Sequence, residues 1–63
     1  MKKKPKCKLI GTNGNVFTLY GKVREALREA GLYKEREEFS SRLFKCESYD
    51  EALALMCEYV DIY

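Results

Sequence analysis

The chain has 63 residues, of which 46% are hydrophobic and 35% charged, with a formal net charge of +2. A chain this short forms one domain, buries only about 60% of its extended surface and has no room for a large active-site cleft, so self-association is expected. Its aromatic and aliphatic content is that of a globular protein, and no apolar run forms a membrane span or a secretory signal. We therefore expect a cytoplasmic protein that does not engage a membrane.

The N-terminal part predicts a charged lead-in followed by one short strand. Residues 1–5 contain three lysines and a proline, which cannot donate a hydrogen bond in a sheet. We interpret residues 1–5 as a basic flexible lead-in and residues 6–63 as a single domain. Residues 6–10 are expected to form a strand that turns Cys7 and Leu9 to one face, and residues 11–14 are expected to form a loop.

Two interpretations compete for residues 15–20. The Asn-Gly pair at 13–14 is a strong hairpin signal, and the next six residues have the propensity of a returning strand, although their alternation is poor. In the other interpretation Asn15 caps a helix, which ends where Gly31 adopts the left-handed conformation and Leu32 folds back onto Leu27. The helix is favoured by an apolar stripe at 3.6-residue spacing, formed by Val16, Leu19, Tyr20, Val23, Leu27 and Ala30.

Two more helices and a strand are expected to follow. Residues 34–45 predict a helix with Phe39 and Leu43 facing inward and Phe44 beside them, and its acidic start and basic end suit the helix macrodipole. Ser48 and Glu51 match a capping box. The helix that they open has an apolar stripe of Tyr49, Ala52, Leu53, Met56 and Val60. Residues 59–63 alternate as in a strand.

These elements predict a small α+β domain of the order β-α-α-α-β. The basic residues Lys6 and Lys8 in the first strand and the acidic Asp61 in the last suit cross-strand pairing, so the two terminal strands should form one sheet. A sheet of two strands is marginal and leaves exposed edges. We therefore expect a homodimer in which the sheet continues from one copy into the other.

The usual components of catalysis and metal binding are missing from the sequence. It has no histidine, and its three cysteines, Cys7, Cys46 and Cys57, form no Cys-x-x-Cys pair. Their odd number, without a signal peptide, favours a reducing compartment and a role as small apolar residues. A serine or cysteine nucleophile would lack its ordinary base, and the loop at residues 11–15 lacks the phosphate-binding motifs. We expect no enzyme activity, cofactor or metal.

The charge is distributed unevenly along the chain. Residues 1–31 hold eight basic and two acidic residues, a net charge of +6, whereas residues 32–63 hold four basic and eight acidic residues, a net charge of −4. Such a dipolar chain can attract a second copy or a partner of either sign. Candidate contacts to nucleic acid or to an acidic partner are Lys6, Lys8, Lys22, Arg24 and Arg28. The acidic first turns of the later helices oppose an approach to DNA phosphates.

Aromatic residues are numerous for so small a core. The chain has five tyrosines and three phenylalanines, and both types are favoured in protein interfaces. The candidates for contact with a partner or in a dimer are Phe17, Tyr20, Tyr33 and Tyr63. Binding of a host protein is therefore the preferred prediction, and a small nucleic-acid-binding regulator that uses the basic N-terminal half is the alternative.

Five short motifs in sequence order resemble a family of short proteins encoded in phages and integrative elements. They occupy residues 8–11, 13–17, 24–31, 48–53 and 58–62, so the resemblance covers nearly the whole chain. In size and general build the chain is also similar to the compact dimeric phage inhibitor of the Hachiman defence system. The resemblance implies a protein of a phage or mobile element that binds a host protein stoichiometrically, for example as an anti-defence inhibitor.

Overall fold

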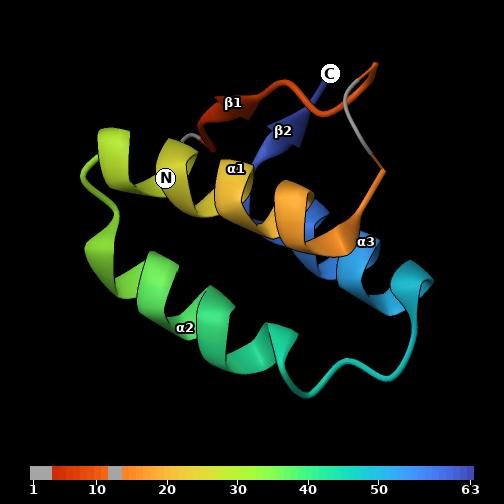
Figure 1. Ribbon diagram of the computed structural model, residues 1–63. Coiled ribbons are helices and arrows are strands. Elements are labelled where there is room, and N and C mark those ends of the chain that lie inside the picture. Colours follow the sequence, from red (N-terminus) through yellow and green to blue (C-terminus); the bar gives the residue numbers. More distant parts are fainter. Residues whose placement is uncertain (1–3, 12–13) are drawn as a thin grey trace.

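The computed structural model describes residues 4–11 and 14–63, which form three helices and a sheet of two strands (Figure 1). The elements are β1 (Lys6–Cys7), α1 (Val16–Glu29), α2 (Tyr33–Leu43), α3 (Tyr49–Tyr59) and β2 (Asp61–Ile62). The helices pack against one another, and the sheet lies beside α1 at the end of the molecule away from α2. The predicted α+β class and the order β-α-α-α-β are confirmed.

The sheet joins the two ends of the described chain in a parallel arrangement. Lys6 pairs with Asp61 and Cys7 pairs with Ile62, so the three helices together form the crossover that a parallel pair requires. The strand predicted at residues 6–10 ends at Cys7, because the N–H groups of Leu9 and Ile10 both donate to the main-chain oxygen of Tyr63, at 2.8 and 2.9 Å.

The second strand is also shorter than predicted, since it comprises Asp61 and Ile62, and Tyr59 belongs to α3. Residues 1–3 of the expected lead-in lie outside the described residues. Lys4 donates a hydrogen bond of 2.9 Å to the main-chain oxygen of Cys57, and the oxygen of Pro5 accepts from the N–H of Asp61 at 2.8 Å. Lys4 and Pro5 are therefore tied to the C-terminal half of the fold.

Local capping decides between the two interpretations of residues 15–20. The side-chain oxygen of Asn15 accepts a hydrogen bond of 2.8 Å from the N–H of Phe17, and α1 begins at Val16. An N-cap satisfies an N–H group that has no partner inside the helix. The helix is confirmed and the hairpin is wrong; Asn13 of the hairpin motif lies outside the described residues.

The end of α1 follows the predicted pattern. Gly31 has a positive φ of 77°, and its N–H donates to the oxygen of Arg28 at 3.0 Å. The N–H of Leu32 donates to the oxygen of Leu27 at 2.9 Å. These two bonds define a Schellman ending, and they turn the chain into α2.

The later helices differ from the prediction in small but consequential ways. α2 spans Tyr33–Leu43 and not residues 34–45, because a turn takes over at its end. At the start of α3 the hydroxyl of Ser48 accepts from the N–H of Glu51 at 3.2 Å, as a capping box requires. The carboxylate of Glu51 accepts from the N–H of Glu47 at 2.6 Å, one residue earlier than in the standard box.

The core lies between the three helices and the inner face of the sheet. Phe39 is fully buried at its centre, and its ring lies 5.6 Å from that of Tyr20 and 5.4 Å from that of Tyr59. The other core side chains come from β1, the three helices and the residues that flank the strands: Cys7, Leu9, Leu19, Val23, Leu27, Leu43, Ala52, Leu55, Met56 and Val60. Cys7 and Leu9 face inward as predicted.

Four expectations about the core are wrong, and the first concerns Tyr49, which belongs to the predicted stripe of α3 but is exposed. Phe44 was expected beside the inward residues of the second helix, but it follows the last residue of α2 and its side chain is exposed. Ala30 is exposed because it caps α1. Leu55 and Tyr59 are buried although they lie outside the predicted stripe of α3, because this helix is covered on two sides, by α1 and by α2.

No helix in the described part of the chain is both long enough and apolar enough to span a bilayer.

Candidate functional site

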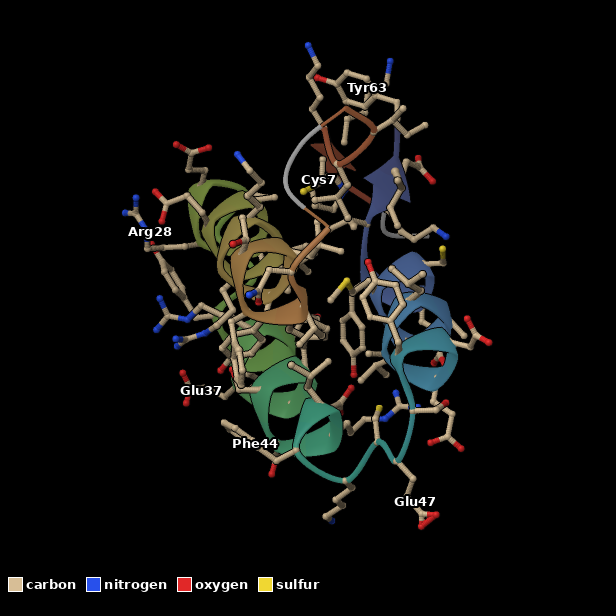
Figure 2. The ribbon with its side chains drawn as sticks, turned by 45° about the vertical axis from the view of Figure 1, so that its right-hand side comes forward. Cys7, Arg28, Glu37, Phe44, Glu47 and Tyr63 are labelled. Carbon is tan, nitrogen blue, oxygen red and sulfur yellow. The ribbon has the colours of Figure 1, made fainter. Side chains whose placement is uncertain are left out.

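An open groove of about 380 Å³ lies where the start of α1, the end of α2 and the start of α3 meet. Figure 2 shows Phe44 and Glu47, which line it, at the end of the molecule opposite Tyr63 and the sheet. The groove is lined by Val16, Phe17, Leu43, Phe44, Cys46, Glu47, Ser48, Tyr49 and Ala52. We call this feature the aromatic groove.

Three aromatic side chains form the exposed walls of the aromatic groove. Phe17 is 71% exposed, Phe44 74% and Tyr49 45%. Leu43 and Ala52, which also line it, belong to the buried core. Large apolar side chains that gather around a hollow mark binding surfaces more often than scattered exposed ones do.

Each wall is positioned by a local feature of the chain. Phe17 stands in the first turn of α1 because Asn15 caps that helix. The hydroxyl of Tyr49 donates a hydrogen bond of 2.7 Å to the main-chain oxygen of Gly14, which fastens the first turn of α3 to the segment before α1. Phe44 is the C-cap of α2, and its ring lies 6.0 Å from that of Tyr20. The walls therefore come from the start of α1 and from the junction between α2 and α3, which lies much later in the sequence.

The electrostatic character of the aromatic groove is mildly acidic. Among the lining residues, all of which are described, Glu47 carries the only charge. Its main-chain N–H is bonded to the Glu51 carboxylate, so the loop that carries Glu47 is held by the cap of α3. A surface of this kind suits an apolar group flanked by a positive charge.

The four aromatic residues predicted as contacts do not share one surface. Phe17 lines the aromatic groove, and Tyr63 is exposed at the sheet. Tyr20 is half-buried, with its ring stacked on Phe39. Tyr33 is exposed at the start of α2, with the guanidinium of Arg36 5.8 Å from its ring centre.

Sequence reasoning missed two walls of the aromatic groove, Phe44 and Tyr49. Phe44 follows Leu43 directly and therefore falls off the face that Phe39 and Leu43 share, which was a signal that it does not belong to the core. Tyr49 falls on the apolar stripe of α3, so the 3.6-residue period of the helix could not reveal that this side chain is exposed.

The basic candidate residues fall into two groups, and each group has carboxylates beside it. Lys6, Lys8 and Lys22 line a shallow hollow of about 250 Å³ between β1 and α1, together with Glu25 and Glu29. The structure does not place Arg24 and Arg28 with these lysines.

Each of the two arginines has an acidic partner, Arg24 on α2 and Arg28 on α1 itself. Arg24 lies 3.9 Å from the carboxylate of Glu37, with its guanidinium 5.5 Å from the centre of the Tyr20 ring. Arg28 is bonded to Glu25 and holds the pKa of that carboxyl below its ordinary value. Much of the positive charge predicted for nucleic-acid contact is therefore already paired within the chain.

The cysteines are dispersed. Cys7 belongs to β1 and its side chain is buried; this burial raises the pKa of its thiol, an effect that the nearby Lys22 opposes. Within residues 4–11 and 14–63, no three His, Cys, Asp or Glu side chains are grouped so that they could hold a metal ion.

The fold and the aromatic groove define a small α+β domain with an exposed apolar hollow at one end. Comparison of the chain with models of protein families, with curated proteins and with solved structures found no significant match.

Proposed function

We propose that this chain works by stoichiometric, non-enzymatic binding of a host protein through the aromatic groove. The role that follows from the resemblance is that of a phage or mobile-element accessory protein, such as an anti-defence inhibitor. The observation that carries the proposal is the gathering of three exposed aromatic rings, Phe17, Phe44 and Tyr49, around one hollow. Aromatic anchors in desolvated pockets supply most of the binding energy in protein interfaces.

The chemistry of the aromatic groove favours a protein over a nucleic acid. Nucleic-acid sites combine aromatic rings with cations that neutralise phosphates. Here the single charged residue among the described lining residues is Glu47, which would repel a phosphate. The partner that fits is a protein segment with an aliphatic or aromatic side chain for the groove and a lysine or arginine beside it for Glu47.

One observation supports the alternative function of a nucleic-acid-binding regulator. Lys6, Lys8 and Lys22 share a hollow on the side of the sheet, although Glu25 and Glu29 line it too. Binding there would weaken steeply with salt, because it would depend on the release of counterions from phosphates. Lys22→Glu would reduce such binding, whereas Phe44→Ala would not affect it.

The experiment is a pull-down of the tagged protein from bacterial lysate, with and without nuclease, followed by mass spectrometry. The test variant is Phe44→Ala and the matched control is Tyr33→Ala, because both residues are exposed aromatics at opposite ends of α2. We expect one stoichiometric protein that survives nuclease and salt, is lost with Phe44→Ala and is kept with Tyr33→Ala. Recovery that vanishes with nuclease, or equal recovery by the two variants, would contradict the proposal.

A further inference from the structure

The outer edge of β2 exposes main-chain groups that have the geometry to pair with another strand. The N–H groups of Asp61 and Tyr63 donate to Pro5 and Cys7, at 2.8 and 3.1 Å. Because successive residues of a strand direct their main-chain groups to opposite edges, the N–H and C=O of Ile62 face away from β1. Figure 2 shows β2 on the side of the sheet away from α1.

We propose that this edge pairs with β2 of a second copy, antiparallel, about a two-fold axis at Ile62. In this register each Ile62 donates its N–H to the C=O of the other Ile62 and accepts from its N–H. The contact is therefore self-complementary, as a two-fold axis requires. The result is a four-stranded sheet of order β1-β2-β2-β1. A sheet of only two strands depends on the helix packed against it for its stability, and two further strands would add hydrogen bonds and apolar contacts to it.

Side chains on both faces of the sheet suit this register. Ile62 is half-buried on the inner face, and a second Ile62 beside it would complete its burial and join the two cores. On the outer face, Asp61 would lie opposite Tyr63 of the second copy. Tyr63 is 55% exposed.

Charge selects the β2 edge rather than the β1 edge. Pairing through β1 would place Lys6 and Lys8 of one copy opposite those of the other, and like charges directly opposite are unfavourable. In the β2 pairing these lysines stay on the outer strands. Each Asp61 keeps its own cationic neighbours, Lys6 in the adjacent strand and Lys4 at 3.8 Å.

The size of this contact sets its expected strength. Stable interfaces bury ~1,200–2,000 Å² in total, and an edge of two residues with Tyr63 beside it offers less. We therefore expect a dimer that forms as concentration rises. The two aromatic grooves lie at the ends remote from the sheets, so the dimer would offer both of them to partners.

The test combines sedimentation velocity with amide hydrogen exchange followed by NMR on the full chain. Between about 10 μM and 1 mM the apparent mass should rise toward twice that of the monomer. Over the same range exchange at the Ile62 amide should slow by roughly tenfold. The Lys6 amide is the internal control, because it faces the opposite edge of the sheet.

Ile62→Pro removes the donor at the outer edge without removing a bond to β1, so it should leave a folded monomer at every concentration. Phe44→Ala should dimerise like the unaltered chain, which separates this inference from the aromatic groove. A chain that stays monomeric to about 1 mM would overturn the proposal. A dimer in which the Ile62 amide shows no added protection would also overturn it. The exchange measurement needs no substitution, so it decides the matter even if Ile62→Pro does not fold.

Discussion

The hydroxyl of Tyr49 in the first turn of α3 is hydrogen-bonded to the main-chain oxygen of Gly14, 35 residues earlier, at 2.7 Å. This contact fastens the start of α3 to the segment before α1, and the same Tyr49 ring is a wall of the aromatic groove. The shape of the groove therefore depends on a tertiary hydrogen bond that no local sequence pattern encodes.

Tyr49→Phe removes this hydroxyl and keeps the ring. We expect the free energy of unfolding to fall by about 0.5–1 kcal/mol, because the bond is neutral and partly exposed to water. Affinity for the protein partner should also fall, since the α1 end of the groove loses an anchor. Urea denaturation and partner titration measure the two effects, with Tyr33→Phe as the control; equal stability loss in both variants would contradict the role given to this bond.

Phe39→Ala and Phe44→Ala separate the core from the surface. Phe39 is fully buried between two other rings, so its truncation should cost ~3–5 kcal/mol and unfold much of the protein at 25 °C. Phe44 is exposed, so its truncation should change the free energy of unfolding by less than about 0.5 kcal/mol. Thermal and urea denaturation compare them directly, and a large loss in Phe44→Ala would show that this ring supports the fold.

Two glycines should respond to alanine in opposite directions. Gly21 lies inside α1, and a Cβ there would meet nothing within 4 Å, so Gly21→Ala should stabilise the protein by roughly 0.5–1 kcal/mol. Gly31 has φ +77°, where a Cβ is strained, so Gly31→Ala should cost about 1–2 kcal/mol. The shift in urea midpoint measures both. A Gly31→Ala change that did not destabilise the protein would contradict the Schellman ending, and a destabilising Gly21→Ala would contradict the open space at that position.

Alkaline pH should weaken the contact between α2 and α3. Burial and the hydrogen bond to the Glu38 carboxylate raise the pKa of Tyr59 above its ordinary value of about 10, although Arg42, which donates to the phenol oxygen at 3.1 Å, opposes the shift. The folded state thus favours the neutral phenol. Its contribution is complete below pH 10 and is lost as pH rises through the folded-state pKa.

The measurement is the urea midpoint between pH 8 and pH 11. Tyr59→Phe should be less stable than the unaltered chain at pH 8, by about 1 kcal/mol, and should lose less stability on the way to pH 11. Tyr33→Phe removes a phenol from an exposed position and is the matched control. If the urea midpoint of Tyr59→Phe fell as steeply between pH 8 and pH 11 as that of the control, ionisation of Tyr59 would be excluded as the cause of the alkaline loss of stability.

Much of the fold could be predicted from the sequence because its signals are local. The side chain of Asn15, the positive φ of Gly31 and the Ser48 cap each act within a few residues, so helix starts and ends could be identified from residue type and spacing. The 3.6-residue period likewise identified the buried Leu19, Val23 and Leu27.

Other features depended on packing. The two strands are parallel because three helices return the chain to the same end, and alternation within five residues carries no information about direction. Both strands are two residues long, shorter than predicted, because the N–H groups of Leu9 and Ile10 both donate to the main-chain oxygen of Tyr63. This is a contact between the two ends of the described chain.

The candidate site likewise combines features that the sequence predicted with features that depended on packing. The sequence by itself determined that aromatic residues exceed what so small a core can bury, and it identified Phe17 among the surplus. Only the tertiary structure decided which rings share a surface: it placed Phe44 and Tyr49 beside Phe17, turned Tyr20 toward the core, and separated Arg24 and Arg28 from the lysines. The physical reason is range: caps and helical periods act over a few residues, whereas a groove is made by elements that meet only once the chain has packed.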